Sequence, residues 1–157
     1  MHQVTQSSGT PERVLSLSLA FPIGLPGFED HHSFTLFGLG PEFGPYLGLR
    51  STIEGGPTFV VVQPSEVGIE MAVDIDDFCQ SLLGIRDASE VIVFVIATLG
   101  VNGESPTVNT QAPLVINVSN WRCAQVLQGN QAYSMRESVD VLFRDESRMG
   151  EAYSEPR

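Results

Sequence analysis

The first regular pattern in the chain is an alternation of apolar and polar residues from Val14 to Phe21. Leucines alternate with serines there, which is the period of a strand that buries one face and exposes the other. The segment therefore predicts a strand. It is short and often interrupted by serine, so it does not resemble a membrane span or the apolar part of a signal peptide.

Short apolar segments of the same kind recur along the chain, each bounded by Gly, Pro, Ser or Glu. The longest, VIVFVIATL, is apolar on both faces and rich in β-branched residues, as is typical of a central strand. The pattern indicates about eight or nine strands. The predicted strands span residues 14–21, 34–37, 46–49, 59–62, 69–73, 91–99, 113–118 and 123–127.

One segment, DIDDFCQSLLGI, has the pattern of a helix. Asp74 is the predicted N-cap, two further aspartates follow in the first turn, and Gly84 marks the end. Phe78 and Leu82, four residues apart, form the predicted apolar stripe together with Leu83. Many short strands and a single helix predict an all-β, mainly antiparallel fold: a small β-barrel-like domain with one short helical insertion.

The length of 157 residues, 42% of them hydrophobic, suits one globular domain. We expect this domain to span residues 13–143. Residues 1–12 and 144–157 lack apolar periodicity, so we expect a flexible N-terminus and a flexible C-terminal tail.

Eight basic residues against 19 acidic ones give a formal net charge of -11. This charge argues against nucleic acid or an anionic membrane as a direct partner and suits a basic protein. An acidic surface that merely keeps a cytosolic protein soluble is equally consistent with it. Cys79 and Cys123 belong to no metal-binding spacing and read as reduced core residues. With no segment of about 18 apolar residues, we expect a cytoplasmic protein.

The stretch FPIGLPGFED, residues 21–30, concentrates glycine and proline and runs directly into His31 and His32. It reads as a ligand loop, a metal site or a corner of the fold. Adjacent residues on a strand point to opposite faces, so the acids and histidines do not converge on one ion. Glycines for positive φ and prolines for turns favour a corner. No nucleotide, hydrolase or protease motif is present, and we predict no catalytic residue, metal or cofactor.

A series of segments, taken in order, resembles the FliW family of flagellar assembly factors. The matching segments are FPIGLPGFED, YLGLRS (46–51), FVVVQP (59–64), LGIRDASEVIVFVIATL (83–99), TVNTQAPLVIN (107–117) and AQVLQ (124–128). The similarity runs from about Leu19 to Arg136, roughly three quarters of the chain.

This resemblance implies a small antiparallel barrel without catalytic activity, monomeric when free, that acts by binding proteins. Members of the family bind the translational regulator CsrA and relieve its repression of flagellin messenger RNA, and flagellin binds FliW in turn. The implied function is a flagellar assembly factor that couples flagellin level to flagellin translation. Both partners are implied by the resemblance alone.

The sequence departs from the family pattern at Arg50, at residues 65–68, at Thr110 and Gln111, and at residues 136–138. Because lost apolar positions near an edge are ones that a partner would contact, a chaperone of flagellin alone stays an alternative. A further alternative is a small barrel that carries a ligand or acts as an enzyme.

The residues that we expect at a partner surface come from the corner, from its motif neighbours, and from residue types enriched at interfaces. For the glycines and prolines of the corner and for Asn109, the alternative to partner binding is a structural role, in which they set the backbone geometry. The candidates are Gly24, Leu25, Pro26, Gly27, Phe28, Glu29, Asn109, Pro113, Trp121, Arg122, Tyr133 and Arg136.

Overall fold

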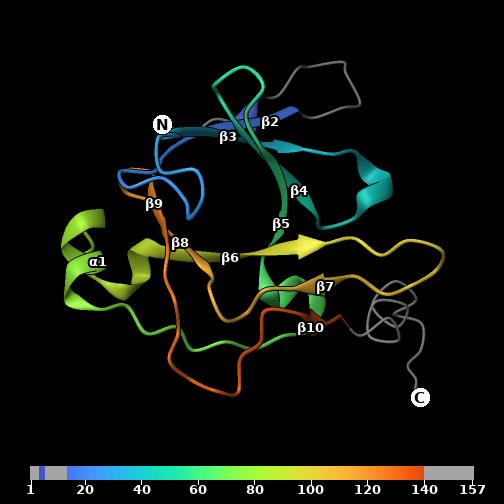
Figure 1. Ribbon diagram of the computed structural model, residues 1–157. Coiled ribbons are helices and arrows are strands. Elements are labelled where there is room, and N and C mark those ends of the chain that lie inside the picture. Colours follow the sequence, from blue (N-terminus) through green and yellow to red (C-terminus); the bar gives the residue numbers. More distant parts are fainter. Residues whose placement is uncertain (1–3, 6–13, 140–157) are drawn as a thin grey trace.

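The computed structural model describes residues 4–5 and 14–139 and consists mainly of strands (Figure 1). Its one α-helix is α1 (Asp77–Leu83), and three short 3-10 helices are η1 (Pro41–Phe43), η2 (Pro64–Val67) and η3 (Ala88–Glu90). The strands are β1 (Val4–Thr5), β2 (Val14–Ala20), β3 (Ser33–Gly38), β4 (Leu47–Ser51), β5 (Thr58–Val62), β6 (Val91–Thr98), β7 (Thr107–Val108), β8 (Leu114–Asn117), β9 (Arg122–Gln125) and β10 (Glu137–Ser138).

Seven strands close into a barrel in the order β2, β3, β4, β5, β6, β8, β9 and back to β2. The ring closes because β6 pairs with β5 along one edge and with β8 along the other. All neighbours in the ring are antiparallel except β2 and β9, which meet in parallel where Ala20 lies opposite Arg122. The prediction of a mainly antiparallel all-β barrel with one short helix is confirmed.

Apolar side chains fill the interior of the barrel. Phe21 and Phe34 are fully buried with ring centroids 4.7 Å apart, and Phe94 enters from β6. The side chains of β6 alternate: Phe94 joins this interior cluster, and Val95 joins a second cluster. An interior filled by side chains is the usual state of a small barrel.

Helix α1 covers a third cluster, in which Cys79 and Leu83 pack against residues of β8 and β9. Its last carbonyl groups are held from those strands and from the turn between them. The side-chain amides of Asn117 and Asn120 donate to Leu83 O at 2.8 and 3.0 Å, and Arg122 donates to Leu82 O at 3.2 Å. Since the final carbonyls of a helix have no partner inside it, these bonds fix where α1 ends.

The predicted start of the helix was wrong by two residues. Asp76, in extended conformation, accepts a hydrogen bond from Cys79 N–H at 2.8 Å and is the N-cap. The predicted stripe was wrong at Phe78, which is 63% exposed, whereas Leu83 is buried together with Cys79 and Leu82 packs against the same cluster. The end at Gly84, with φ +67°, agrees with the prediction.

The predicted strand over 69–73 is absent from the sheet. The segment keeps an alternation of half-buried and exposed residues, but side chains bind its backbone. The Tyr133 hydroxyl bonds to both N–H and C=O of Ala72, at 3.0 and 3.2 Å. The Gln128 amide does the same for Asp74, at 2.8 and 3.0 Å.

The strands β7 and β10, of two residues each, were not predicted. They pair with each other, and β7 extends the sheet along the second half of β6 (Figure 1). In the predicted flexible N-terminus, Val4–Thr5 pairs with β2. The rest of residues 1–12 and all of the tail 144–157 lie outside the described residues. Within the described part, none of the helices is both long and apolar enough to cross a bilayer.

Candidate interaction surface

The glycine- and proline-rich stretch is a tight corner between β2 and β3. Phe28 N–H donates to Leu25 O at 2.7 Å across a turn in which Pro26 and Gly27 are central, and Gly27 has φ +86°. Proline followed by a residue with positive φ is the composition of a type II turn. Leu25 is buried, and the Phe28 ring meets Phe59 edge to face at 5.8 Å. The corner is anchored in the core of the barrel.

Gly24 and Glu29 fix the shape of this corner. Gly24 has φ +67°, and a methyl group there would lie 2.6 Å from Phe28 O and 2.7 Å from Glu29 Cα. The Glu29 carboxylate accepts a hydrogen bond from Gly27 N–H at 3.0 Å, and this bond lowers the pKa of Glu29. Pro26, Gly27 and Glu29 are exposed, so a partner can reach the tip of the corner.

Asn109 and Pro113 shape the turn between β7 and β8. Asn109 Oδ1 accepts hydrogen bonds from the N–H groups of Gln111 and Ala112, at 3.0 and 3.1 Å. Pro113 is buried and its carbonyl accepts from Val126 N–H at 2.9 Å. Both residues make contacts that maintain the fold.

The four candidates chosen by residue type lie in different parts of the molecule. They are Trp121, Arg122, Tyr133 and Arg136. Trp121 packs against the interior cluster with φ +60°, and Arg122 binds the end of α1. Tyr133 holds Ala72, and Arg136 is exposed beside β10. Of all the predicted candidates, Tyr133 alone lines the groove described next.

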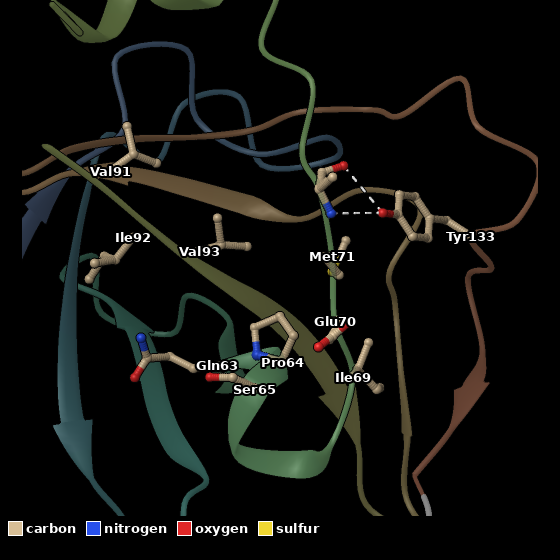
Figure 2. Close-up of a pocket in the computed structure, with 11 residues that line it drawn as sticks. Gln63, Pro64, Ser65, Ile69, Glu70, Met71, Val91, Ile92, Val93 and Tyr133 are labelled. Atoms are coloured by element: carbon tan, nitrogen blue, oxygen red, sulfur yellow. Dashed lines mark hydrogen bonds between the residues drawn. The ribbon is translucent and has the colours of Figure 1, made fainter. Parts of the chain in front are cut away.

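A groove of about 770 Å³ runs between the first half of β6 and the segment 69–72 (Figure 2). Sequence reasoning missed it, since it depends on where β5 leaves β6. A second groove of about 360 Å³ shares Met71, Val91 and Val93 with it and continues toward α1. The first groove is lined by Gln63, Pro64, Ser65, Ile69, Glu70, Met71, Ala72, Val91, Ile92, Val93 and Tyr133.

Carboxylates dominate the charged surface of the described residues. One ion pair is present there, Arg86 with Glu90 at 3.3 Å. Arg50 lies over the Phe37 ring, 4.3 Å from its centroid, and Arg122 is engaged at the helix end. The exposed carboxylates are those of Glu29, Asp30, Glu42, Glu54, Glu66, Glu70, Asp74, Asp76, Asp77, Asp87 and Glu104.

The histidines and cysteines have separate surroundings. His31 Nδ1 bonds to Ser51 Oγ at 2.7 Å, and His32 Nδ1 to Phe21 O at 3.1 Å. Cys79 and Cys123 are buried free thiols, as predicted, and burial raises the pKa of both. In the described part of the chain, no three His, Cys, Asp or Glu side chains are grouped to hold a metal ion.

Residues 3–139 match the family model described as FliW protein. The chain belongs to the FliW family. The match spans the barrel, the corner and both faces of the groove, so the fold described above is that of a FliW domain.

Several FliW relatives are similar over most of their length. The flagellar assembly factor FliW of Caldanaerobacter subterraneus is 30% identical over 119 residues, which are 76% of this chain and 79% of that protein. The flagellar assembly factor FliW of an Exiguobacterium species is 34% identical, with 76% and 81% covered. A crystal structure of the flagellar assembly factor FliW superposes with a TM-score of 0.68 at 30% identity, covering 78% of this chain and 85% of that one.

Thr110 and Glu137, two of the positions where we expect departures from the FliW pattern, contact each other. The Thr110 hydroxyl lies 3.5 Å from Glu137 Oε1, and it also bonds to the carbonyl and the N–H of Ser134. Thr110 is fully buried. Because a buried hydroxyl needs a partner, Thr110 ties the turn after β7 to the segment that leads into β10.

Proposed function

We propose that this FliW protein is a non-enzymatic flagellar assembly factor that binds a CsrA-like translational regulator and flagellin. The observation that carries the proposal is the FliW family match over residues 3–139. The relatives that resemble it over most of their length are named flagellar assembly factors. In this proposal it acts in the cytoplasm, where both partners are made.

The charge of the protein supports a basic partner. The net charge is -11, and exposed carboxylates outnumber arginines on the described surface. A surface of one sign accelerates encounter with a surface of the opposite sign and disfavours partners of like charge. An RNA-binding regulator carries the positive surface that RNA requires.

The test is a pair of calorimetric titrations of the full-length protein, one with the purified CsrA-like regulator and one with flagellin from the same organism. The proposal expects saturable binding of each. If the two partners are linked through this protein, saturation with flagellin should weaken binding of the regulator. Absence of both interactions would refute the proposal.

A chaperone of flagellin alone is the second candidate, favoured by the departures at Arg50 and at residues 65–68. Residues 64–67 form η2, and two of them line the groove. Binding of flagellin without binding of the regulator would establish this narrower function.

A further inference from the structure

The pairing of β5 with β6 stops halfway along β6. The last pair is Val62 with Val95, and the same register would place Pro64 opposite Val93. Pro64 has no N–H group, begins η2, and its carbonyl already accepts from Ile69 N–H at 3.0 Å. Proline therefore ends the ladder here. The side of β6 that β5 leaves uncovered, residues 91–93, is named the open edge.

Hydrogen bonds at both ends of β6 show which way its backbone groups point. Glu90 O accepts from Val118 N–H at 2.8 Å, and Ile96 O accepts from Asn109 N–H at 2.8 Å. Even-numbered residues of this strand thus bond toward β8 and β7. Because successive residues of a strand bond to opposite sides, odd-numbered residues bond toward β5.

Val93 is the odd-numbered residue at the centre of the open edge. Val95, the next one, lies opposite Val62 of β5. Val91 donates its N–H to Ala88 O and retains a carbonyl on this side. For the N–H and C=O of Val93, the described part of the chain offers no backbone partner. An unpaired edge of this kind is a template for another strand.

The groove lies along this edge and not over one face of the sheet. Three consecutive residues of β6 line it, and Figure 2 shows Val91 and Val93 pointing to one side and Ile92 to the other. Consecutive side chains reach the same groove only when the groove passes the edge of a strand. Met71, half-buried on the facing segment, lines both this groove and its continuation.

We propose that the open edge of β6 binds an extended segment of a partner protein by strand addition. The segment has apolar side chains at alternate positions, which contact Val93 and Met71, and basic residues between them. Its backbone supplies the hydrogen bonds that Pro64 cannot make. The inference rests on the proposed function only in that this protein acts by binding proteins.

Charge selects a basic segment. Glu70 is the one charged residue lining the groove in the described chain, and it is exposed. The only arginine along the continuation, Arg86, is bonded to Glu90, and Asp87 lies beside it. A lysine or arginine side chain of the added strand that reaches Glu70 therefore meets a negative charge.

The test uses a synthetic nine-residue peptide, capped at both ends, that alternates valine with lysine and threonine. It is titrated into the isotopically labelled full-length protein while backbone amide signals are recorded. We expect saturable shifts in residues 91–93 and 69–73, and slower hydrogen exchange at Val93 N–H. Shifts confined to another surface, or no saturable binding, would overturn the proposal. Neither CsrA nor flagellin is used, so failure here leaves the proposed function intact.

Two N-methylated peptides separate strand addition from apolar contact. One carries methyl groups on the amides of its odd residues and the other on those of its even residues. Only one set of amides faces β6, so one peptide should bind at least about tenfold more weakly and the other should keep its affinity. Equal affinities for the two would overturn strand addition.

Charge reversal tests the preference for a basic segment. Glu70→Lys should weaken binding of the lysine peptide, and Glu104→Lys, at another exposed glutamate outside this groove, should not. A second copy of this chain is the competing occupant. A dimer by sedimentation, with Val93 N–H protected before peptide is added, would replace the proposal by self-association.

Discussion

At the scale of single residues, the corner shows why two glycines that both have positive φ are not equivalent. Gly24 and Gly27 both have positive φ, but only Gly24 is also enclosed by backbone atoms. Space is open around the position that a Cβ would take at Gly27. The corner itself was predictable because glycine and proline report backbone geometry directly. Which glycine is enclosed was not, since that depends on how residues 24–29 fold back.

The two glycines therefore predict different stabilities for the same substitution. Gly27→Ala should destabilise by about 1–2 kcal/mol, the cost of a left-handed backbone for a residue with a Cβ. Gly24→Ala carries that cost and in addition a clash with Phe28 O at 2.6 Å, so its loss should be larger. Urea unfolding of both variants measures the difference. Equal losses would contradict the enclosure of Gly24.

Glu29 predicts a pH dependence at the same corner. The Gly27 N–H bond lowers its folded pKa, so its stabilising effect is complete above the unfolded pKa and is lost as pH falls through the folded one. Glu29→Gln should lower the melting temperature slightly at pH 7, and the difference should vanish in acid. Glu54→Gln, at an exposed glutamate, is the control. A difference that persists in acid would show that the charge is not responsible.

At the scale of elements, strands with a clear alternation and several neighbours were predicted well, and segments without these features were not. Residues 69–73 have the alternation of a strand, but Tyr133 and Gln128 take the place of a neighbouring strand. Periodicity reports which side chains are buried and says nothing about what bonds the backbone. β7 and β10 contain too few residues to show any period.

The start of α1 illustrates a choice that sequence leaves open. Asp74, Asp76 and Asp77 are all acceptable near a helix N-terminus, so composition does not decide among them. The structure gives Asp76 the bond to Cys79 N–H and leaves the Asp74 backbone to Gln128. The end of the helix was easier to predict from the sequence, because a single glycine follows it.

The contribution of the N-cap to stability can be measured by substituting Asp76 and Asp74 in turn. Asp76→Ala removes the side-chain acceptor at the helix start and should cost about 1 kcal/mol of unfolding free energy. Asp74→Ala keeps the backbone groups that bind Gln128 and should cost much less. Chemical denaturation of both variants, with amide exchange at Cys79, checks the assignment. A greater loss for Asp74→Ala would restore the N-cap expected from the sequence.

At the scale of the whole molecule, closure of the barrel depends on pairs that chain order does not reveal. β2 meets β9, and β6 meets β8 after β7 has intervened. The number and length of the strands favoured a barrel, but these pairings come only from the folded chain. The groove at β6 follows from the same topology, because one strand serves three neighbours and β5 covers only part of its length.

Net charge acts at this scale too, and it predicts how binding of the proposed regulator responds to salt. The Debye length falls from about 30 Å at 0.01 M to about 8 Å at 0.15 M ionic strength. With a net charge of -11 on this protein, the association rate with a basic partner should fall steeply over that range, and the dissociation rate should change far less. Stopped-flow mixing with the purified regulator measures both rates.

A matched variant makes the salt test specific. Replacing the exposed Glu54 and Glu104 by glutamine changes the net charge from -11 to -9, because each substitution removes one negative charge. Neither residue lines the groove at β6. The association rate at low salt should therefore decrease, and the difference from the parent protein should disappear at high salt. If the association rate changes neither with salt nor with the substitutions, the acidic surface serves solubility alone and recognition depends on local contacts.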